Sequence, residues 1–166
     1  MRHLEAVCAR QPLFIGRDIL QFAMAQTPYR DVEIPSEEEL AEACQGDLHP
    51  MAIEGMRLFD AGDFWHAHEA LEEAWLAEEG PARILYIGIL QAGVTYLQIE
   101  RKNFVGAAKM FERSKRYLEP LPDACRGVNV EQLRHDLVEA MHAAGRLGPE
   151  RLDQFDTNLF KPLVRN

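Results

Sequence analysis

The chain has 166 residues, of which 47% are hydrophobic and 27% charged, and its formal net charge is −9. This length and composition are typical of one globular domain with its own core, and they exclude a disordered or fibrous protein. The acidic charge and the lack of a lysine or arginine run argue against a nucleic acid or an anionic membrane as partner.

The three cysteines, Cys8, Cys44 and Cys125, are far apart and form no Cys-x-x-Cys pair. An odd number at such spacing indicates neither a disulfide framework nor a thiolate zinc site, and it favours a reduced protein. The sequence shows no signal-peptide core, and no apolar run approaches the roughly 18 residues of a membrane span. We therefore expect a soluble, cytoplasmic protein.

The first 46 residues are expected to form an N-terminal helical extension. A helix is predicted at about residues 13–25, and prolines interrupt the connector that follows it. Ser36 followed by Glu39 is a capping-box pattern for a second, short helix. Residues 47–166 are expected to form the core domain.

Caps mark the helices of this core. Asp63, Asn103 and Asn129 are N-cap residues, and Pro50 and Pro149 fit first turns. Helices are therefore predicted at 50–61, 63–79, 82–102, 103–119 and 129–145, with a short one from 149. The helix at 82–102 contains ILYIGILQAGVTYLQIE, which is apolar on nearly every side. The sequence predicts an all-α fold, a compact bundle of about five to seven helices around this central apolar helix.

The stretch DFWHAHEALEEAW, from Asp63 to Trp75, is rich in polar groups that could carry chemistry. At about 100° per residue, its apolar side chains share one face of a helix. Three polar residues point away from that face, as on a solvated surface: His66, Glu69 and Glu73. His68 and Glu72, four residues apart, lie together at the margin of the apolar face.

Two interpretations of His68 and Glu72 stay open. A neutral imidazole and a carboxylate at this spacing can bind one zinc, iron or manganese ion, although further ligands from other helices are needed. Alternatively, Glu72 accepts a hydrogen bond from His68 and so satisfies a half-buried polar pair.

The central helix carries one polar strip, formed by Gln91, Thr95 and Gln98. This strip could face His68 and Glu72 across a small polar pocket, or its amides could simply be hydrogen-bonded between helices. The aromatic side chains of the neighbouring helix could line the same pocket, but aromatic residues at helical spacing usually belong to the core.

His135, Glu139 and His142 form a second polar group. Glu139-x-x-His142 has the spacing of carboxylate-bridged di-iron bundles, but the sequence offers no second copy on another helix. The apolar residues of this helix define the opposite face, so the group is expected in solvent.

Three motifs follow one another between residues 51 and 118. They are Gly55-x-x-Leu58-Phe59-Asp60-x-Gly62-Asp63-Phe64-Trp65-x-Ala67-His68-Glu69-x-Leu71-Glu72-x-x-Trp75, Gly88-x-Leu90-Gln91 and Arg101-x-Asn103-x-x-Gly106-Ala107. Together they resemble the small prokaryotic proteins catalogued as domain of unknown function 309. The resemblance implies an all-helical, cytoplasmic domain, sometimes labelled a predicted metal-dependent hydrolase with no established substrate.

The resemblance also implies a set of functional positions. The matching motif residues are His68, Glu69, Glu72, Trp75, Gln91, Arg101 and Asn103. Two departures weaken the metal interpretation. This chain has Leu97-Gln98 where the family often has Tyr-His, and His66 stands where an acidic residue is common.

The leading hypothesis is a polar pocket that binds a small molecule or a divalent metal. In a metal-dependent hydrolase, His68 and Glu72 would be ligands and Glu69 the general base. The pocket would be lined by Trp75, Gln91, Gln98, Arg101 and Asn103. The alternative is a non-catalytic helical interaction module in which these residues form a structural network. An apolar face with Phe104, Ala108 and Phe111 is either core or a contact between copies in a homo-oligomer.

Overall fold

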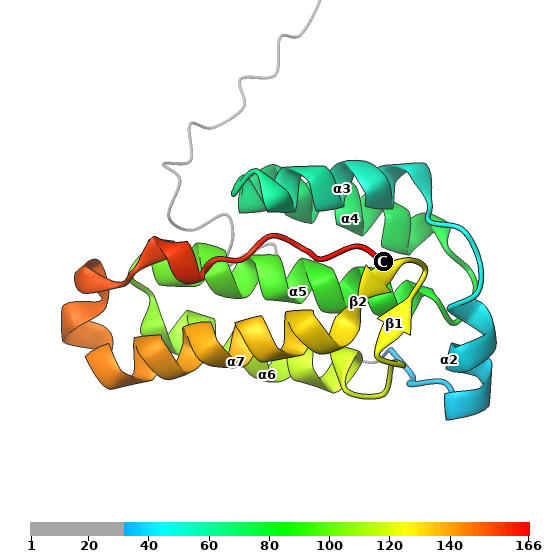
Figure 1. The fold of residues 1–166 in the computed structure, drawn as a ribbon. Coiled ribbons are helices and arrows are strands. Elements are labelled where there is room, and N and C mark those ends of the chain that lie inside the picture. Colours follow the sequence, from blue (N-terminus) through cyan, green and yellow to red (C-terminus); the bar gives the residue numbers. More distant parts are fainter. Residues whose placement is uncertain (1–31) are drawn as a thin grey trace, which may run out of the picture. The chain divides into compact units, whose positions relative to one another are not determined.

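The computed structural model describes residues 32–166 (Figure 1). Residues 34–166 form one compact unit, which includes the short helix after Ser36. The helix predicted at 13–25 lies outside the described residues, and the division of the chain at residue 46 stays a prediction.

The described unit is almost entirely helical, as predicted. Its α-helices are α2 (Glu37–Ala43), α3 (Pro50–Asp60), α4 (Phe64–Ala77), α5 (Arg83–Glu100), α6 (Phe104–Leu118) and α7 (Val130–Leu147). Two 3-10 helices follow, η2 (Pro149–Gln154) and η3 (Thr157–Leu159). The all-α prediction is confirmed, and the predicted helix bounds differ from the observed ones by only a few residues.

The predicted caps account for where these helices begin. Ser36 and Glu39 form a complete capping box, in which each side chain accepts a hydrogen bond from the backbone N–H of the other. The side chains of Asp63, Asn103 and Asn129 accept hydrogen bonds from the first turns of α4, α6 and α7.

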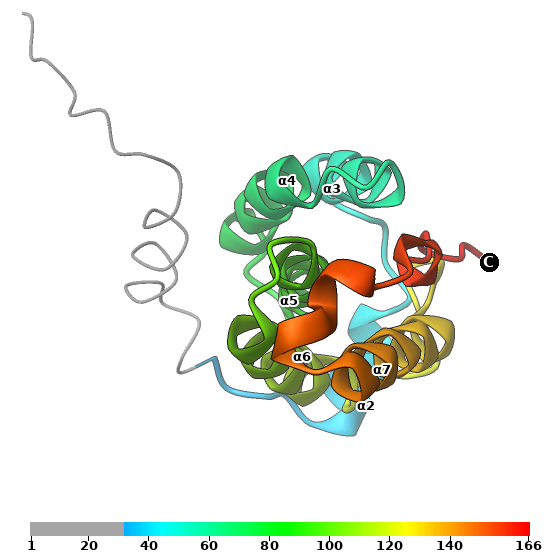
Figure 2. The ribbon, with the colours of Figure 1, turned by 90° about the vertical axis from the view of Figure 1, so that its left-hand side faces the viewer.

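Helix α5 lies at the centre of the unit (Figures 1 and 2). The α3–α4 hairpin packs on one side of it, and α6 and α7 lie on the other. Every residue from Ile84 to Ile99 is buried, which agrees with the apolar sequence of this helix. Gly88 permits the close approach of α6, because a Cβ there would lie 2.6 Å from Leu118 Cδ2.

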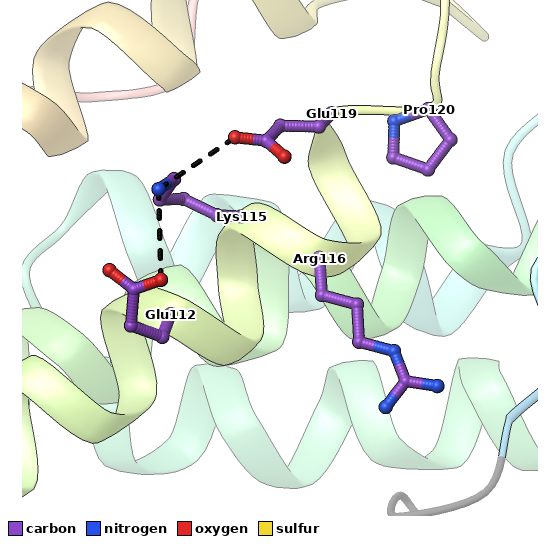
Figure 3. Close-up of a pocket in the computed structure, with 5 residues that line it drawn as sticks. All are labelled: Glu112, Lys115, Arg116, Glu119 and Pro120. Carbon is purple, nitrogen blue, oxygen red and sulfur yellow. Dashed lines mark ion pairs between the residues drawn. The ribbon is translucent and has the colours of Figure 1, made fainter.

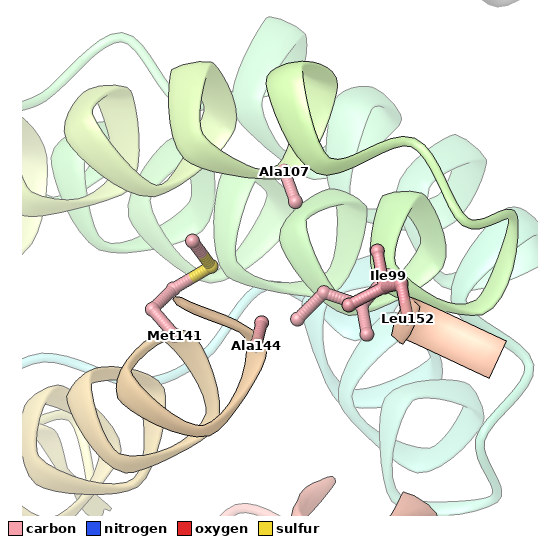
Figure 4. Close-up of a cluster of buried hydrophobic side chains, with 5 residues drawn as sticks. All are labelled: Ile99, Ala107, Met141, Ala144 and Leu152. Atoms are coloured by element: carbon pink, nitrogen blue, oxygen red, sulfur yellow. The ribbon is translucent and has the colours of Figure 1, made fainter. Parts of the chain in front are cut away.

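A second group of apolar side chains joins α5, α6 and α7 to the C-terminal region (Figure 4). Its buried members are Ile99, Ala107, Met141, Ala144 and Leu152. Phe104, Ala108 and Phe111 pack against this cluster, so their face of α6 contributes to the core. The tail also packs on the bundle, since the ring of Phe160 lies 4.8 Å from that of Tyr96, centroid to centroid.

The sequence did not predict the small hairpin between α6 and α7. Strand β1 (Ala124–Cys125) pairs antiparallel with β2 (Val128–Asn129). Arg126 and Gly127 form the turn with positive φ angles of 48° and 79°, the conformation that matches the twist of a two-residue hairpin. Strands this short leave no alternating pattern in the sequence.

The prediction that the cysteines form no disulfide is wrong. Cys44, at the end of α2, and Cys125, in β1, are disulfide-bonded with their Cα atoms 4.4 Å apart. The two residues are 81 positions apart in the sequence, so only the packing of α2 against the hairpin brings them together. Within residues 32–166, no helix is both long and apolar enough to cross a membrane.

Candidate functional site

Helix α4 presents two polar faces of different character. His66, Glu69 and Glu73 are exposed, whereas His68 is buried and Glu72 is half-buried, as the helical spacing predicts. The Asp63 carboxylate begins the helix and also lies 2.8 Å from His66 Nδ1. The hydrogen bond with His66 holds the pKa of Asp63 below its ordinary value.

His68 is buried without hydrogen bonds in the described structure. Its side chain is 8% exposed, and neither ring nitrogen has a hydrogen-bond partner, so the hydrogen bond to Glu72, one of the two interpretations left open, is not formed. The imidazole instead stacks on the indole of Trp65, with ring centroids 6.3 Å apart. Burial lowers the pKa of His68, and the charges of Glu72 and Glu69 oppose this in part. Burial therefore favours the neutral form of the imidazole, which lies near two carboxylates.

Helices α4 and α5 run antiparallel, and three side-chain contacts define their register. The rings of Phe64 and Tyr96 are 5.4 Å apart, Arg101 lies 5.6 Å from the Trp65 ring, and Arg83 lies 4.5 Å from the Trp75 ring. The start of α4 thus faces the end of α5. This register places His68 and Glu72 opposite the middle of α5, the stretch that contains Gln91.

Gln91 has an unusual environment for a buried amide. Its side chain is fully buried, and neither its Oε1 nor its Nε2 has a hydrogen-bond partner among residues 32–166. Thr95 does not supply one, because its hydroxyl donates to the backbone oxygen of Gln91 at 2.9 Å. The amide pairing between helices that would explain a structural Gln91 is therefore not formed.

Gln98 and Asn103, in contrast, have defined structural partners. Asn103 Nδ2 donates to Gln98 Oε1 at 2.8 Å, and Asn103 Oδ1 accepts from the backbone N–H of Gly106 at 3.0 Å. Arg101 lies on Trp65, as described above. The candidate residues thus separate into two groups: Gln98, Arg101 and Asn103 join α5 to its neighbours, whereas His68 and Gln91 have unsatisfied polar atoms.

Trp75 belongs to the core more than to a surface pocket, because its side chain is only 2% exposed. One hollow on the surface lies elsewhere, along the end of α6 (Figure 3). It has a volume of about 550 Å³ and is lined by Glu112, Lys115, Arg116, Glu119 and Pro120. Lys115 forms ion pairs of 3.6 and 3.9 Å with the two glutamates there, so the charges of this hollow largely neutralise one another.

The second polar group, on α7, is exposed as predicted at His135, Glu139 and His142. The structure adds Asp136, which brings a carboxylate within 4.8 Å of the ligand atoms of His135 and Glu139. Asp136 already accepts a hydrogen bond from Gln132 at 2.8 Å. Among residues 32–166, a group of three possible metal-ligand atoms within 4.8 Å of one another is formed by His135, Asp136 and Glu139. Within the same residues, His68 is not part of such a group.

Comparison with known proteins gives a match that begins in α3 and ends in α6. Residues 52–110 match the family model described as Domain of unknown function (DUF309). The predicted resemblance is confirmed. The DUF309 segment contains His68, Glu69, Glu72, Gln91 and Asn103, and therefore both groups of candidate residues.

One relative matches a longer stretch of the chain than the DUF309 segment. An uncharacterized protein of Aquifex aeolicus (strain VF5) is 28% identical over 89 residues, which are 53% of this chain and 27% of that protein. The match thus spans only about a quarter of the length of that relative. Neither description names an activity, and the protein is one of unknown function.

Proposed function

We propose that this protein binds a divalent metal ion through His68 and Glu72 and acts as a metal-dependent hydrolase. The observation that carries the proposal is the imidazole of His68, which is buried with both nitrogens unpartnered. A buried polar group without a partner costs about 1–3 kcal/mol, so such a group points to a ligand.

The chemistry of the residues fits a cation. The neutral imidazole of His68 offers a nitrogen lone pair, and the charges of Glu72 and Glu69 are close enough to affect its pKa. The register of α4 and α5 puts Gln91 on the stretch of α5 that lies opposite His68 and Glu72. Its unpartnered amide could orient a substrate, because a carboxamide is a better hydrogen-bonding group than a zinc ligand.

A bound divalent ion would supply a Lewis acid and lower the pKa of a coordinated water. In the hydrolysis that we propose, Glu69 accepts the proton of the attacking water. Glu69 is exposed and directly follows His68, so it must turn toward the site to do so.

Elemental analysis of protein purified without an affinity tag or chelator tests the proposal. We expect close to one zinc, iron or manganese per chain in the wild type, and its loss in both His68→Ala and Glu72→Ala. Glu73→Ala is the matched control, because Glu73 is adjacent in sequence but exposed on the opposite face. Absence of metal after incubation with each ion would refute the metal-dependent hydrolase.

The second candidate is a non-catalytic helical interaction module, in which the motif residues fix helix register. The hydrogen bond between Asn103 and Gln98 and the stacking of Arg101 on Trp65 favour it. A wild type without metal, together with a loss of stability in His68→Ala, would support this candidate instead.

The setting of the protein is part of the proposal. The proposal places the protein in the cytoplasm, as its number and spacing of cysteines favour. The substrate that we propose is a small molecule. The Cys44–Cys125 bond argues in the opposite direction, because disulfides persist mainly in oxidising compartments. Phe104, Ala108 and Phe111 are partly buried against the core cluster, which favours a core role for this face of α6 over a contact between copies in a homo-oligomer.

A further inference from the structure

Arg126 joins four segments of the unit beside the disulfide. Its backbone N–H donates to the Cys44 oxygen at 2.8 Å, and its Nε donates to the Ala43 oxygen at 2.9 Å. Its Nη1 donates to both Glu78 and the Tyr86 hydroxyl at 2.9 Å. The guanidinium, only 13% exposed, therefore binds the end of α2 to the ends of α4 and α5.

Helix α2 has few other attachments to the unit. It has seven residues, of which only Leu40 is buried within the described structure. A helix this short does not form by itself, so its contacts must hold it. Among the contacts within residues 32–166 that hold it are the buried Leu40, the disulfide of Cys44 and the two hydrogen bonds from Arg126 to the carbonyls at its end.

We propose that Cys44 and Cys125 form a reversible redox site, and that reduction of their bond by a dithiol releases α2 from the hairpin. In this exchange the Cys44–Cys125 S–S bond breaks and one S–S bond forms in the reductant. The dithiol gives up two electrons and two protons, and the protons end on the thiols of Cys44 and Cys125. The site is distinct from His68 and does not depend on the proposed hydrolase.

The surroundings make Cys44 the sulfur to be attacked. Both cysteines are buried, Cys44 at 5% exposure and Cys125 at 1%, but Cys44 lines a hollow of about 530 Å³, together with Gly46, Asp47 and Arg126. Attack on Cys44 releases Cys125 as a thiolate. The Cys125 thiolate then takes up a proton, and the second thiol of the reductant attacks the mixed disulfide and frees Cys44.

The location of the site also decides what its reduction would change. Without the disulfide, α2 is held within the described residues mainly by the buried Leu40 and the hydrogen bonds to Arg126. Elements with so few buried contacts open locally at low free energy, whereas α5 opens only with the whole unit. Reduction would therefore expose Arg126 and widen the hollow beside it, without unfolding the bundle.

Alkylation and hydrogen exchange on the full chain test this proposal. All proteins carry Cys8→Ser, which removes the third thiol. The oxidised protein is treated with dithiothreitol under native conditions, alkylated with iodoacetamide and weighed by mass spectrometry. We expect two alkyl groups after reduction and none before, and reoxidation with oxidised glutathione should restore the unmodified mass.

In the reduced protein, amide exchange at residues 37–46 should rise by about tenfold or more, while α5 is unchanged. Amide exchange in the Cys44→Ser/Cys125→Ser variant should match that of the reduced protein and should not change when dithiothreitol is added. A bond that resists dithiothreitol until denaturant is added would overturn the proposal, as would unchanged exchange in α2 or loss of protection throughout the unit. If the double variant does not fold, the reduced and oxidised forms of the Cys8→Ser protein, which keeps Cys44 and Cys125, give the same comparison.

Discussion

Asn103 and Gln98 are joined by a hydrogen bond of 2.8 Å between their side-chain amides, across the corner between α5 and α6. The same Asn103 side chain caps α6 through the N–H of Gly106. Lys102, directly before it, has a positive φ of 59°, so the chain turns sharply here. One residue of the DUF309 motif thus fixes the geometry between the central helix and its neighbour.

Asn103→Ala should lower the free energy of unfolding by about 1–2 kcal/mol, because it removes the helix cap and leaves Gln98 without its donor. Asn103→Asp keeps the capping oxygen and should cost clearly less. Urea unfolding of the three proteins measures this. Equal losses in both variants would show that the cap contributes little.

His68→Leu should leave the stability of the metal-free protein unchanged or raise it, because no hydrogen bond of the structure is lost. The same change should abolish metal uptake. Ser114→Ala is the control for a satisfied buried group: the Ser114 hydroxyl donates to the Gly88 oxygen at 3.0 Å, so we expect a loss of about 1 kcal/mol. Thermal or urea unfolding distinguishes the two. A loss in His68→Leu as large as that in Ser114→Ala would mean that the imidazole has a structural partner.

The stability of the metal-free protein should fall on acidification in a way that depends on His68. Burial holds the pKa of His68 below its ordinary value in the folded state, whereas the unfolded chain has a histidine pKa near 6.5. Between these two pKa values the unfolded state binds more protons, so the free energy of unfolding falls as the pH falls below about 6.5. It falls no further once the pH is below the folded pKa.

The difference in free energy of unfolding between wild type and His68→Leu isolates this effect, because the other titrating groups are common to both proteins. We expect the difference to move against the wild type from pH 7.5 to pH 5. A difference independent of pH would show that His68 titrates alike in the folded and unfolded states.

Two glycines in helices should respond oppositely to alanine. At Gly55 in α3, a Cβ would lie 2.6 Å from Leu71 Cγ and 3.1 Å from its backbone nitrogen, so Gly55→Ala should cost about 1–3 kcal/mol. At Gly145 in α7, a Cβ would meet nothing within 4 Å, so Gly145→Ala should stabilise by roughly 0.5–1 kcal/mol. Urea midpoints check both signs, and destabilisation by Gly145→Ala would contradict the second.

The sequence by itself determined the helices, because their signals are local. An N-cap such as Asp63 or Asn129 acts on the turn that immediately follows it, and a helical period assigns each side chain to a face. For this reason the exposure of His66, Glu69 and Glu73 and the place of His68 at the margin of the apolar face could be predicted. The motifs in residues 52–110 were also enough to identify the resemblance to DUF309.

Only the tertiary structure decided which polar groups have partners. Helical spacing placed Glu72 one turn from His68, yet their hydrogen bond is not formed, while Asn103 and Gln98 are joined around a turn. The Cys44–Cys125 disulfide and the hydrogen bond from Arg126 to the Ala43 oxygen likewise join residues that are 81 and 83 positions apart. A hydrogen bond or an S–S bond needs atoms within a few ångströms, and between distant segments that distance is set by the packing of the whole bundle.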